Sequence, residues 1–133
     1  NVLKNNMGPM SPDDVADMSK SPYVTIGGHS HCHNLLTQLA ESEVRGSLST
    51  STKLLESWVG EKVNHFAYPN GNYSDVVIKV LRELDYKSAM TTEHGVWSGA
   101  ESDFVLPRIA VGRFDSLDSY RARVSGIWDL WER

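Results

Sequence analysis

Three of the five histidines in the chain lie at alternate positions within one short segment. Residues 25–36 read TIGGHSHCHNLL, and the three histidines are His29, His31 and His33. His29 and His33 are four residues apart, so their side chains would face the same way if a helical turn begins here. Two imidazoles so placed can bind one divalent cation, with nitrogen–metal distances of about 2.0–2.1 Å. A polar loop whose histidines are only hydrogen-bonded is the alternative interpretation.

A catalytic metal site needs a third protein ligand, commonly a carboxylate, and an open position for water. His31 is expected to face away from the other two histidines of the segment. His65 and His94 stand alone in the sequence, and we expect structural or solvent-exposed roles for both. Cys32 is the single cysteine, so the chain has no internal disulfide and too few thiols for a cysteine-rich zinc site.

The overall composition is that of an ordinary globular domain. The 133 residues are 40% hydrophobic and 23% charged, which suits one domain with its own core. The formal charge of −4 and the scattered Lys and Arg residues argue against a nucleic-acid partner. No apolar run approaches the roughly 20 residues that span a bilayer, so we expect no membrane span. No signal peptide is visible at the start, and the localisation is left open.

Helix and strand signals alternate along the chain. Ser11 precedes Pro12, Asp13 and Asp14, which is typical of a helix start because it combines a capping hydroxyl, a proline and acids at the positive end of the helix dipole. Further helices are predicted over about 41–59, after Ser74 and after Ser116. Strands are predicted at 23–26, 64–68, 86–90 and 104–111, the last with Pro107 marking a sheet edge or a break.

The apolar faces of the predicted helices define the expected core. In the helix over 41–59 the inward residues are Val44, Leu48, Leu55 and Trp58, and Gly60 ends the helix. The next helix is expected to turn inward Val76, Val77, Val80, Leu81 and Leu84. The last helix carries Leu117, Tyr120, Val124, Ile127, Trp128 and Trp131.

This order of elements predicts an α/β fold with a mostly parallel sheet and helices packed outside it. In such folds the loops after the carboxyl ends of the strands carry the chemistry. The histidine segment follows the strand at 23–26, and the loop PNGNY follows the strand at 64–68. We therefore expect the two loops to open on the same rim of the sheet.

The histidine segment also resembles a known motif. Residues 29–33, HSHCH, are similar to the second motif, His-Ser/Thr-x-x-His, of the polysaccharide deacetylases, the NodB-like homology domain of carbohydrate esterase family 4. The predicted helix that follows resembles the family's next helix, and FAYPNGNYS at 66–74 resembles the third motif, often Tyr-Pro-Tyr-Gly. LDYKSAMTTEHG at 84–95 and FVLPRIAV at 104–111 resemble later segments, so the likeness covers about residues 10–115.

The resemblance implies a fold and an activity. The fold is a distorted (β/α) barrel, with a divalent metal, most commonly zinc, held by one aspartate and two histidines, here His29 and His33. The activity is hydrolysis of N-acetyl groups on a polysaccharide or oligosaccharide, in which a metal-activated water releases acetate. The implied partner is therefore an N-acetylated carbohydrate substrate.

The resemblance also assigns roles to the loop of the third motif. Tyr68, Pro69, Asn70 and Gly71 would bind substrate, and the backbone N–H of Asn70 would stabilise the oxyanion. Asn70 stands where the family usually has tyrosine, which changes the side chain but keeps the backbone donor. Arg108 lies near the position of a late family motif, where it either orients a carboxylate or packs on the surface.

Part of the family pattern is missing from the chain. The first motif, a strand ending in Asp-Asp-Gly, supplies the general base and the third metal ligand, and neither this strand nor the late Leu-x-His motif is present. Asp13 and Asp14 lack the glycine and begin a helix instead. We therefore expect an incomplete barrel without its first strands, in which residues 1–133 form the C-terminal portion of one deacetylase domain. The open sheet edges of such a domain invite homo-oligomers.

Two alternatives to a catalytic deacetylase follow from the same residues. A non-catalytic relative would bind sugar or act as a scaffold, and an Asp-Asp-Gly upstream of Asn1 would argue against it. A hydrolase of the amidohydrolase type would use a His-x-His motif, which the histidine segment could imitate. Such an enzyme needs further ligands after later strands, where the chain offers only His65 and His94.

Overall fold

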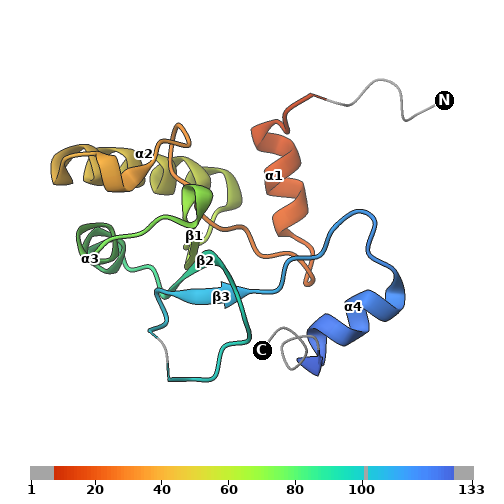
Figure 1. Cartoon of the computed structure of the whole chain (residues 1–133). Coiled ribbons are helices and arrows are strands. Elements are labelled where there is room, and N and C mark those ends of the chain that lie inside the picture. The colour runs from red at the N-terminus through yellow and green to blue at the C-terminus, as the bar shows by residue number, and fades with distance from the viewer. Residues whose placement is uncertain (1–7, 101, 128–133) are drawn as a thin grey trace.

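The computed structural model describes residues 8–100 and 102–127 (Figure 1). The helices within them are α1 (Pro12–Ser19), α2 (Glu41–Val59), α3 (Asp75–Glu83) and α4 (Leu117–Val124). The strands are β1 (His65–Ala67), β2 (Ser88–His94) and β3 (Leu106–Arg108), and two short 3₁₀ turns are η2 (Leu36–Gln38) and η3 (Pro69–Gly71). The alternation of helices and strands predicted from β1 onward is confirmed.

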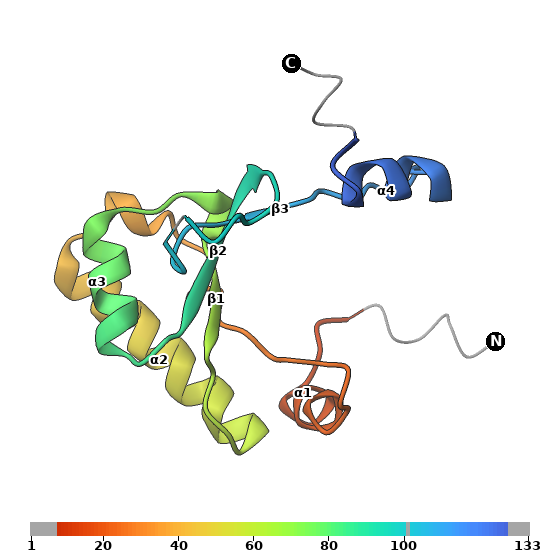
Figure 2. The same cartoon turned by 90° about the horizontal axis from the view of Figure 1, so that it is seen from below.

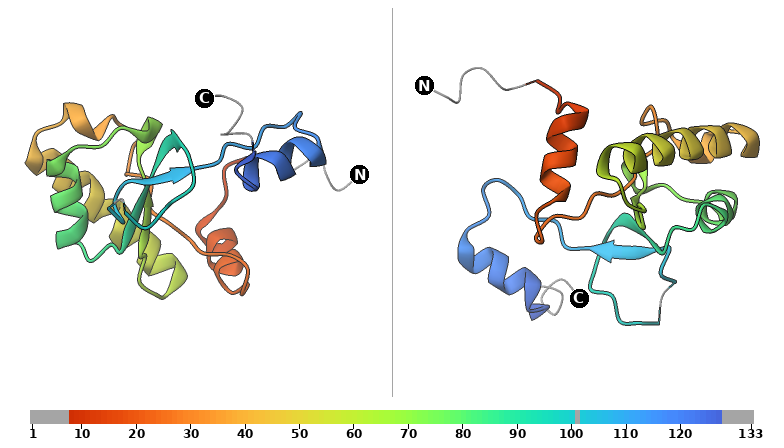
Figure 3. Two further views of the ribbon diagram at one scale, coloured as in Figure 1. Left: turned by 60° about the horizontal axis from the view of Figure 1, so that its bottom comes forward. Right: turned by 180° about the vertical axis from the view of Figure 1, so that it is seen from behind.

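The strands form one parallel sheet in the order β1–β2–β3. β1 and β2 pair from His65 opposite Ser88 to Ala67 opposite Met90, and Leu106 of β3 also lies opposite Met90. α2 and α3 lie together on one side of the strands, as Figure 2 shows, and α4 stands apart beyond β3 (Figure 3). The described residues therefore form part of a parallel α/β layer, with helices packed on one face of the sheet.

The core lies between the sheet and helices α2 and α3. Phe66 is the inward residue of β1 and packs edge to face on Tyr68 and Tyr86, with ring centroids 5.5 and 5.6 Å apart. The Tyr86 hydroxyl lies 2.8 Å from the Thr52 hydroxyl of α2, so each buried hydroxyl has a partner. The buried apolar side chains are Leu36, Val44, Leu48, Val63, Phe66, Tyr68, Val77, Val80, Leu81, Tyr86, Ala89 and Phe104.

The helix ends agree with the sequence prediction. α2 has the predicted bounds and is followed by Gly60, whose φ of 75° lies in the left-handed region. Three serine hydroxyls accept a backbone N–H one turn into their helices, as predicted for Ser11, Ser74 and Ser116. The prediction that Val76 faces inward is wrong, because this side chain is 40% exposed on the outer face of α3.

The strand predicted at 23–26 is not formed. Tyr23 is 95% exposed, and Gly28 makes the isolated bridge to β1. The Gly28 N–H donates to the His65 carbonyl at 2.8 Å, and the Gly28 carbonyl accepts from the Ala67 N–H at 2.9 Å. A Cβ at Gly28 would come 2.5 Å from a buried tyrosine hydroxyl, so glycine is needed where this backbone meets the sheet. The glycine pair, and not the apolar run before it, therefore makes the contact.

α4 exposes most of its apolar side chains. Leu117, Tyr120, Val124 and the following Ile127 are between 43% and 62% exposed. Trp128 and Trp131, which the sequence places on the same helix, lie outside the described residues. Within the described ranges, no helix has both the length and the apolar character that crossing a membrane requires.

Candidate functional site

The histidine segment forms a tight turn beyond the end of β1. Ser30 and His33 have φ values of 65° and 56°, so the backbone enters the left-handed region twice. The helical turn on which the spacing argument for His29 and His33 depended is therefore not formed. The turn nevertheless brings His29 and His33 together, with ring centroids 4.8 Å apart at an interplanar angle of 67°. Both side chains are exposed at this end of the sheet.

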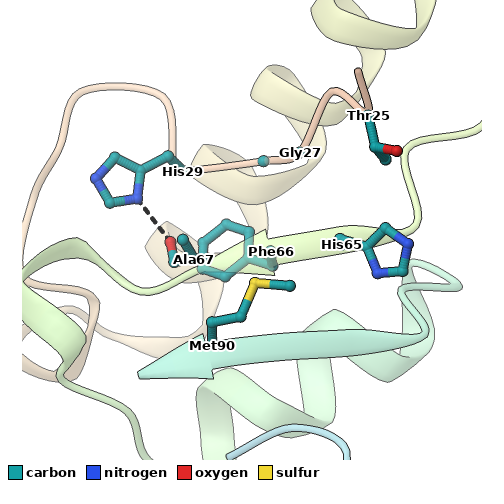
Figure 4. Close-up of a pocket in the computed structure, with 8 residues that line it drawn as sticks. Thr25, Gly27, His29, His65, Phe66, Ala67 and Met90 are labelled. Atoms are coloured by element: carbon teal, nitrogen blue, oxygen red, sulfur yellow. Dashed lines mark hydrogen bonds between the residues drawn. The ribbon is translucent and has the colours of Figure 1, made fainter. Parts of the chain in front are cut away.

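A backbone carbonyl at the end of β1 orients the His29 ring. His29 Nδ1 lies 2.7 Å from the Ala67 carbonyl oxygen (Figure 4). Because a carbonyl only accepts, Nδ1 carries the proton, and Nε2 of the neutral ring keeps its lone pair. This arrangement is typical of histidines that bind metals, where the second ring nitrogen donates to a carbonyl or a carboxylate.

The remaining histidines do not join this pair. The backbone N–H of His31 donates to the Ser47 hydroxyl of α2 at 3.3 Å, and the neighbouring Cys32 is exposed. His65 Nδ1 lies 2.8 Å from the Ser88 hydroxyl, which ties the first residues of β1 and β2 together. His94 ends β2 and lies opposite Arg108 of β3.

A small groove runs along the face of β1 and β2 that is turned away from α2 and α3. Its volume is about 270 Å³, and His29 and His65 lie near its two ends (Figure 4). Ala67 and Met90 form much of its floor, and Gly27 and Gly28 border it from the segment before His29. The groove leads from His65, at the start of β1, to His29 of the histidine pair.

The loop of the third motif follows β1 directly. Tyr68 is 1% exposed, and its hydroxyl donates to the Phe104 carbonyl at 2.9 Å. Burial raises the pKa of Tyr68 above its usual value. Pro69 is also fully buried. The side chains of Tyr68 and Pro69 therefore support the loop from inside, and the substrate contact expected of them stays a prediction.

Asn70 and Gly71 form the exposed part of this loop. Their φ values are 54° and 78°, and the Gly71 N–H donates to the Tyr68 carbonyl at 2.9 Å to close the turn. The Thr92 hydroxyl donates to the Asn70 carbonyl at 3.3 Å. The N–H of Asn70 donates to no acceptor within residues 8–100 and 102–127. It is therefore available to an incoming ligand.

Both loops lie at the same end of the sheet. His29 contacts the carbonyl of Ala67, the last residue of β1, and Asn70 follows only three residues later. The expectation of one shared rim is thus supported by a direct contact. We also predict that the Asn70 backbone lies within roughly 10 Å of the two histidine rings. A water and an acetamide group could bridge a metal and a backbone donor over such a distance.

Arg108, the last residue of β3, has a structural contact with β2. Its Nε donates to the Thr91 carbonyl at 2.6 Å, which links β3 to β2. No carboxylate of the described residues pairs with its guanidinium. A role in orienting a catalytic carboxylate is therefore left as a proposal.

The residues present fit part of a metal site. His29 and His33 supply two nitrogen donors, and the hydroxyl of Ser30 between them is buried without a hydrogen-bond partner in the described structure. Among the described residues, no group of three His, Cys, Asp or Glu side chains comes close enough to hold a metal ion. The turn thus offers two ligands and an unsatisfied polar atom, and it lacks the third ligand.

Asp13 and Asp14 have the structural role that the sequence predicts. The Asp14 carboxylate accepts from the Ser11 N–H at 2.8 Å and from the Ser11 hydroxyl at 2.7 Å. These hydrogen bonds lower the pKa of Asp14, with the side-chain bond as the larger cause. The two acids therefore begin α1 and do not stand in for the missing Asp-Asp-Gly motif.

The polysaccharide deacetylase family profile matches residues 2–89, which is well over half of the chain. The chain belongs to the polysaccharide deacetylase family. Its partial sheet is accordingly an incomplete form of the deacetylase (β/α) barrel, as the sequence led us to expect. No curated protein sequence matches the chain.

Solved deacetylase structures share this fold. The deacetylase PplD of Streptococcus pyogenes, solved with acetate, superposes with a TM-score of 0.82 at 21% identity, over 90% of this chain and 52% of that one. A polysaccharide deacetylase from Bacillus cereus gives 0.79 at 21% identity, over 90% and 38%. The BpsB deacetylase domain of Bordetella bronchiseptica gives 0.68 at 18% identity, over 75% and 48%. The chain thus spans about half or less of these proteins.

Two contacts of the candidate site escape sequence reasoning. The Ala67 carbonyl that orients His29 is a backbone atom, so no residue type marks it. Thr92 lies in the segment TTEHG, whose likeness to the family is visible, but its contact with the loop of the third motif depends on how that loop folds back. Only the repeated threonines after a predicted strand could have drawn attention to it.

Proposed function

We propose that the protein is a metal-dependent hydrolase that removes N-acetyl groups from a polysaccharide or oligosaccharide. The observation that carries the proposal is the His29–His33 pair with His29 oriented by the Ala67 carbonyl, in a member of the polysaccharide deacetylase family. The hydrogen bond that fixes the tautomer of His29 leaves the Nε2 lone pair available for a metal. A histidine that is only solvated does not need a fixed tautomer.

His29 and His33 would hold a divalent metal, and imidazole ligands favour zinc. A bound metal would act as a Lewis acid on the acetyl carbonyl and would lower the pKa of a water molecule. The unpaired N–H of Asn70 would donate to the oxygen on which negative charge develops. The exposed backbone of Asn70 and Gly71 would border the acetyl group, while Arg108 would orient a carboxylate at the rim.

The described residues place no carboxylate beside the histidine pair. The third ligand and the general base would then come from outside the described residues. We therefore expect the 133-residue chain alone to release acetate only slowly from an N-acetylated oligosaccharide, even with zinc or cobalt added.

An acetate-release assay tests this function. Slow, metal-dependent release that is lost in His33→Ala supports the proposal, and release that persists in this variant contradicts it. Rapid turnover by the unchanged chain would mean that another carboxylate, such as Asp75 or Asp103, serves as the base.

The second candidate is a non-catalytic relative that binds acetylated sugar. The incomplete ligand set in the described residues favours it. It predicts saturable binding of N-acetylated oligosaccharides without any metal-dependent acetate release, whereas the hydrolase predicts both.

A further inference from the structure

Thr92 of β2 lies directly beneath the loop of the third motif. Its hydroxyl donates to the Asn70 carbonyl at 3.3 Å. A Cβ built on Gly71 would come 2.1 Å from the Thr92 hydroxyl oxygen and 2.9 Å from the Thr92 Cβ. The Thr92 side chain therefore forms the surface on which the backbone of Asn70 and Gly71 rests.

This contact bears on the direction of one backbone donor. Asn70 has φ 54° and ψ 11°, a conformation that asparagine tolerates better than most residues but that still needs support. The Thr92 hydroxyl donates to the Asn70 carbonyl, and the Gly71 N–H of the same peptide plane donates to the Tyr68 carbonyl, so the two hydrogen bonds together help to hold ψ of Asn70 at its left-handed value.

The N–H of Asn70 makes no hydrogen bond in the described structure and belongs to the preceding peptide plane, whose Pro69 carbonyl accepts from the Asn72 N–H at 3.3 Å. Its direction therefore depends on the conformation of the whole turn, which Thr92 supports at the Asn70 carbonyl.

We propose that Thr92 is a positioning residue that holds this turn in the left-handed conformation from which the Asn70 N–H would donate to the acetyl oxygen. The inference rests on the proposed function, because it takes the Asn70 N–H as the oxyanion donor. Thr92 acts through the loop and touches neither acetyl group nor metal. The acyl group that it serves is small, either an N-acetyl group, whose carbonyl oxygen becomes negative as water adds, or an acetate ion, whose charge is shared by two oxygens.

The chemistry of the contact separates two contributions of Thr92. Thr92→Val keeps the branched shape under Gly71 but removes the hydroxyl donor. Thr92→Ser keeps the donor and removes one methyl group. Thr91→Val is the matched control, because the Thr91 hydroxyl donates to the Leu106 carbonyl at 3.2 Å on the opposite face of the strand.

The first measurement needs no metal. In ¹⁵N-labelled protein, the backbone shifts of Asn70 and Gly71 report whether the loop keeps its left-handed conformation. We expect these shifts to move toward averaged values in Thr92→Val and to stay in place in Thr92→Ser and Thr91→Val. Unchanged Asn70 and Gly71 shifts in Thr92→Val would overturn the proposal, whatever the protein hydrolyses.

The second measurement links the loop to the site. Sodium acetate is titrated into the zinc-loaded chain while the Asn70 amide is followed. We expect this amide to shift on saturation in the unchanged chain, and acetate binding to weaken about three- to tenfold in Thr92→Val, the loss of one hydrogen bond. Zinc affinity should stay the same in all variants.

The two measurements separate the inference from the proposed function. A loop that loosens in Thr92→Val while acetate leaves the Asn70 amide of the unchanged chain unmoved would remove Asn70 as the oxyanion donor, and the positioning role with it. If the unchanged chain binds no zinc but its loop still loosens in Thr92→Val, the result contradicts the proposed function and leaves the support of the loop by Thr92 in place.

Discussion

At the scale of single residues, backbone geometry holds the site together. His33, Asn70 and Gly71 all have positive φ values, and the Ala67 carbonyl fixes the His29 ring. Side chains with a strong preference for extended or helical backbone would not adopt these conformations without cost. The positions that shape the site are therefore small or polar residues placed between well-packed strands.

Gly71 gives the sharpest test of this geometry. Gly71→Ala would place a methyl group 2.1 Å from the Thr92 hydroxyl oxygen and 2.7 Å from the Thr92 N, at a φ of 78°. Strain and overpacking together should lower the free energy of unfolding by roughly 2–4 kcal/mol. Urea denaturation followed by far-UV circular dichroism measures this change.

Gly46 is the matched control for that substitution. It lies within α2, and a Cβ there meets no atom within 4 Å. Gly46→Ala should therefore stabilise the protein by about 0.5–1 kcal/mol through helix propensity. Equal urea midpoints for Gly71→Ala and Gly46→Ala would contradict the close contact between Gly71 and Thr92.

At the scale of elements, the apolar core between α2 and the sheet includes one buried pair of hydroxyls. Thr52 donates to the Leu48 carbonyl at 2.7 Å, so the Tyr86 hydroxyl, 2.8 Å away, donates to Thr52. Tyr86→Phe leaves the Thr52 acceptor unpaired and should cost about 1 kcal/mol of unfolding free energy. Tyr120→Phe, at a 43% exposed position, should leave the free energy of unfolding unchanged. A similar loss in both variants would contradict the role of the buried pair.

The same buried tyrosine predicts a pH dependence at the alkaline end. Burial raises the pKa of Tyr86, and this effect outweighs the hydrogen bond with Thr52, which lowers it. Because the folded-state pKa exceeds the unfolded value, this stabilisation is complete below about pH 10 and is lost as the pH rises through the folded-state pKa. The absorbance of the Tyr86 phenolate is identified by its absence in Tyr86→Phe. As the pH is raised, this absorbance should appear at the same pH at which the circular dichroism of the folded chain is lost. Ionisation of Tyr86 in the fully folded chain would contradict this expectation.

Most elements could be predicted from local sequence because local chemistry fixes them. Capping serines, Gly60 and the apolar period give the bounds of α2 and the starts of α1, α3 and α4. The strand at 23–26 was wrongly predicted because its β-branched residues have no neighbouring strand on their outer side in the described structure. The histidine pair followed from residue type, whereas its tight turn and the Ala67 contact depend on tertiary packing.

At the scale of the whole molecule, the sheet has two unpaired edges in the described residues. β3 is one edge and carries Pro107, which cannot donate a backbone hydrogen bond. The other edge is β1, bridged only at Gly28. We expect copies of the chain to associate through the segment around Thr25, which lines the groove beside β1.

Sedimentation velocity over a wide range of protein concentration tests this association. The unchanged chain should sediment faster as its concentration rises, and Thr25→Lys should weaken the effect because a charged side chain disfavours edge pairing. Ser57→Lys, on the exposed surface of α2, is the control and should associate like the unchanged chain. A monomer at every concentration would contradict the expectation.

Zinc titration of three single alanine variants by isothermal calorimetry tests the histidine pair most directly. The pair predicts that His29→Ala and His33→Ala each weaken zinc binding by roughly tenfold or more, while His31→Ala binds like the unchanged chain, since the His31 ring takes no part in the pair. Affinity of the unchanged chain should itself be modest, because the described residues supply two of the ligands. Loss of zinc binding in His31→Ala with binding retained in His33→Ala would contradict the assignment of the site.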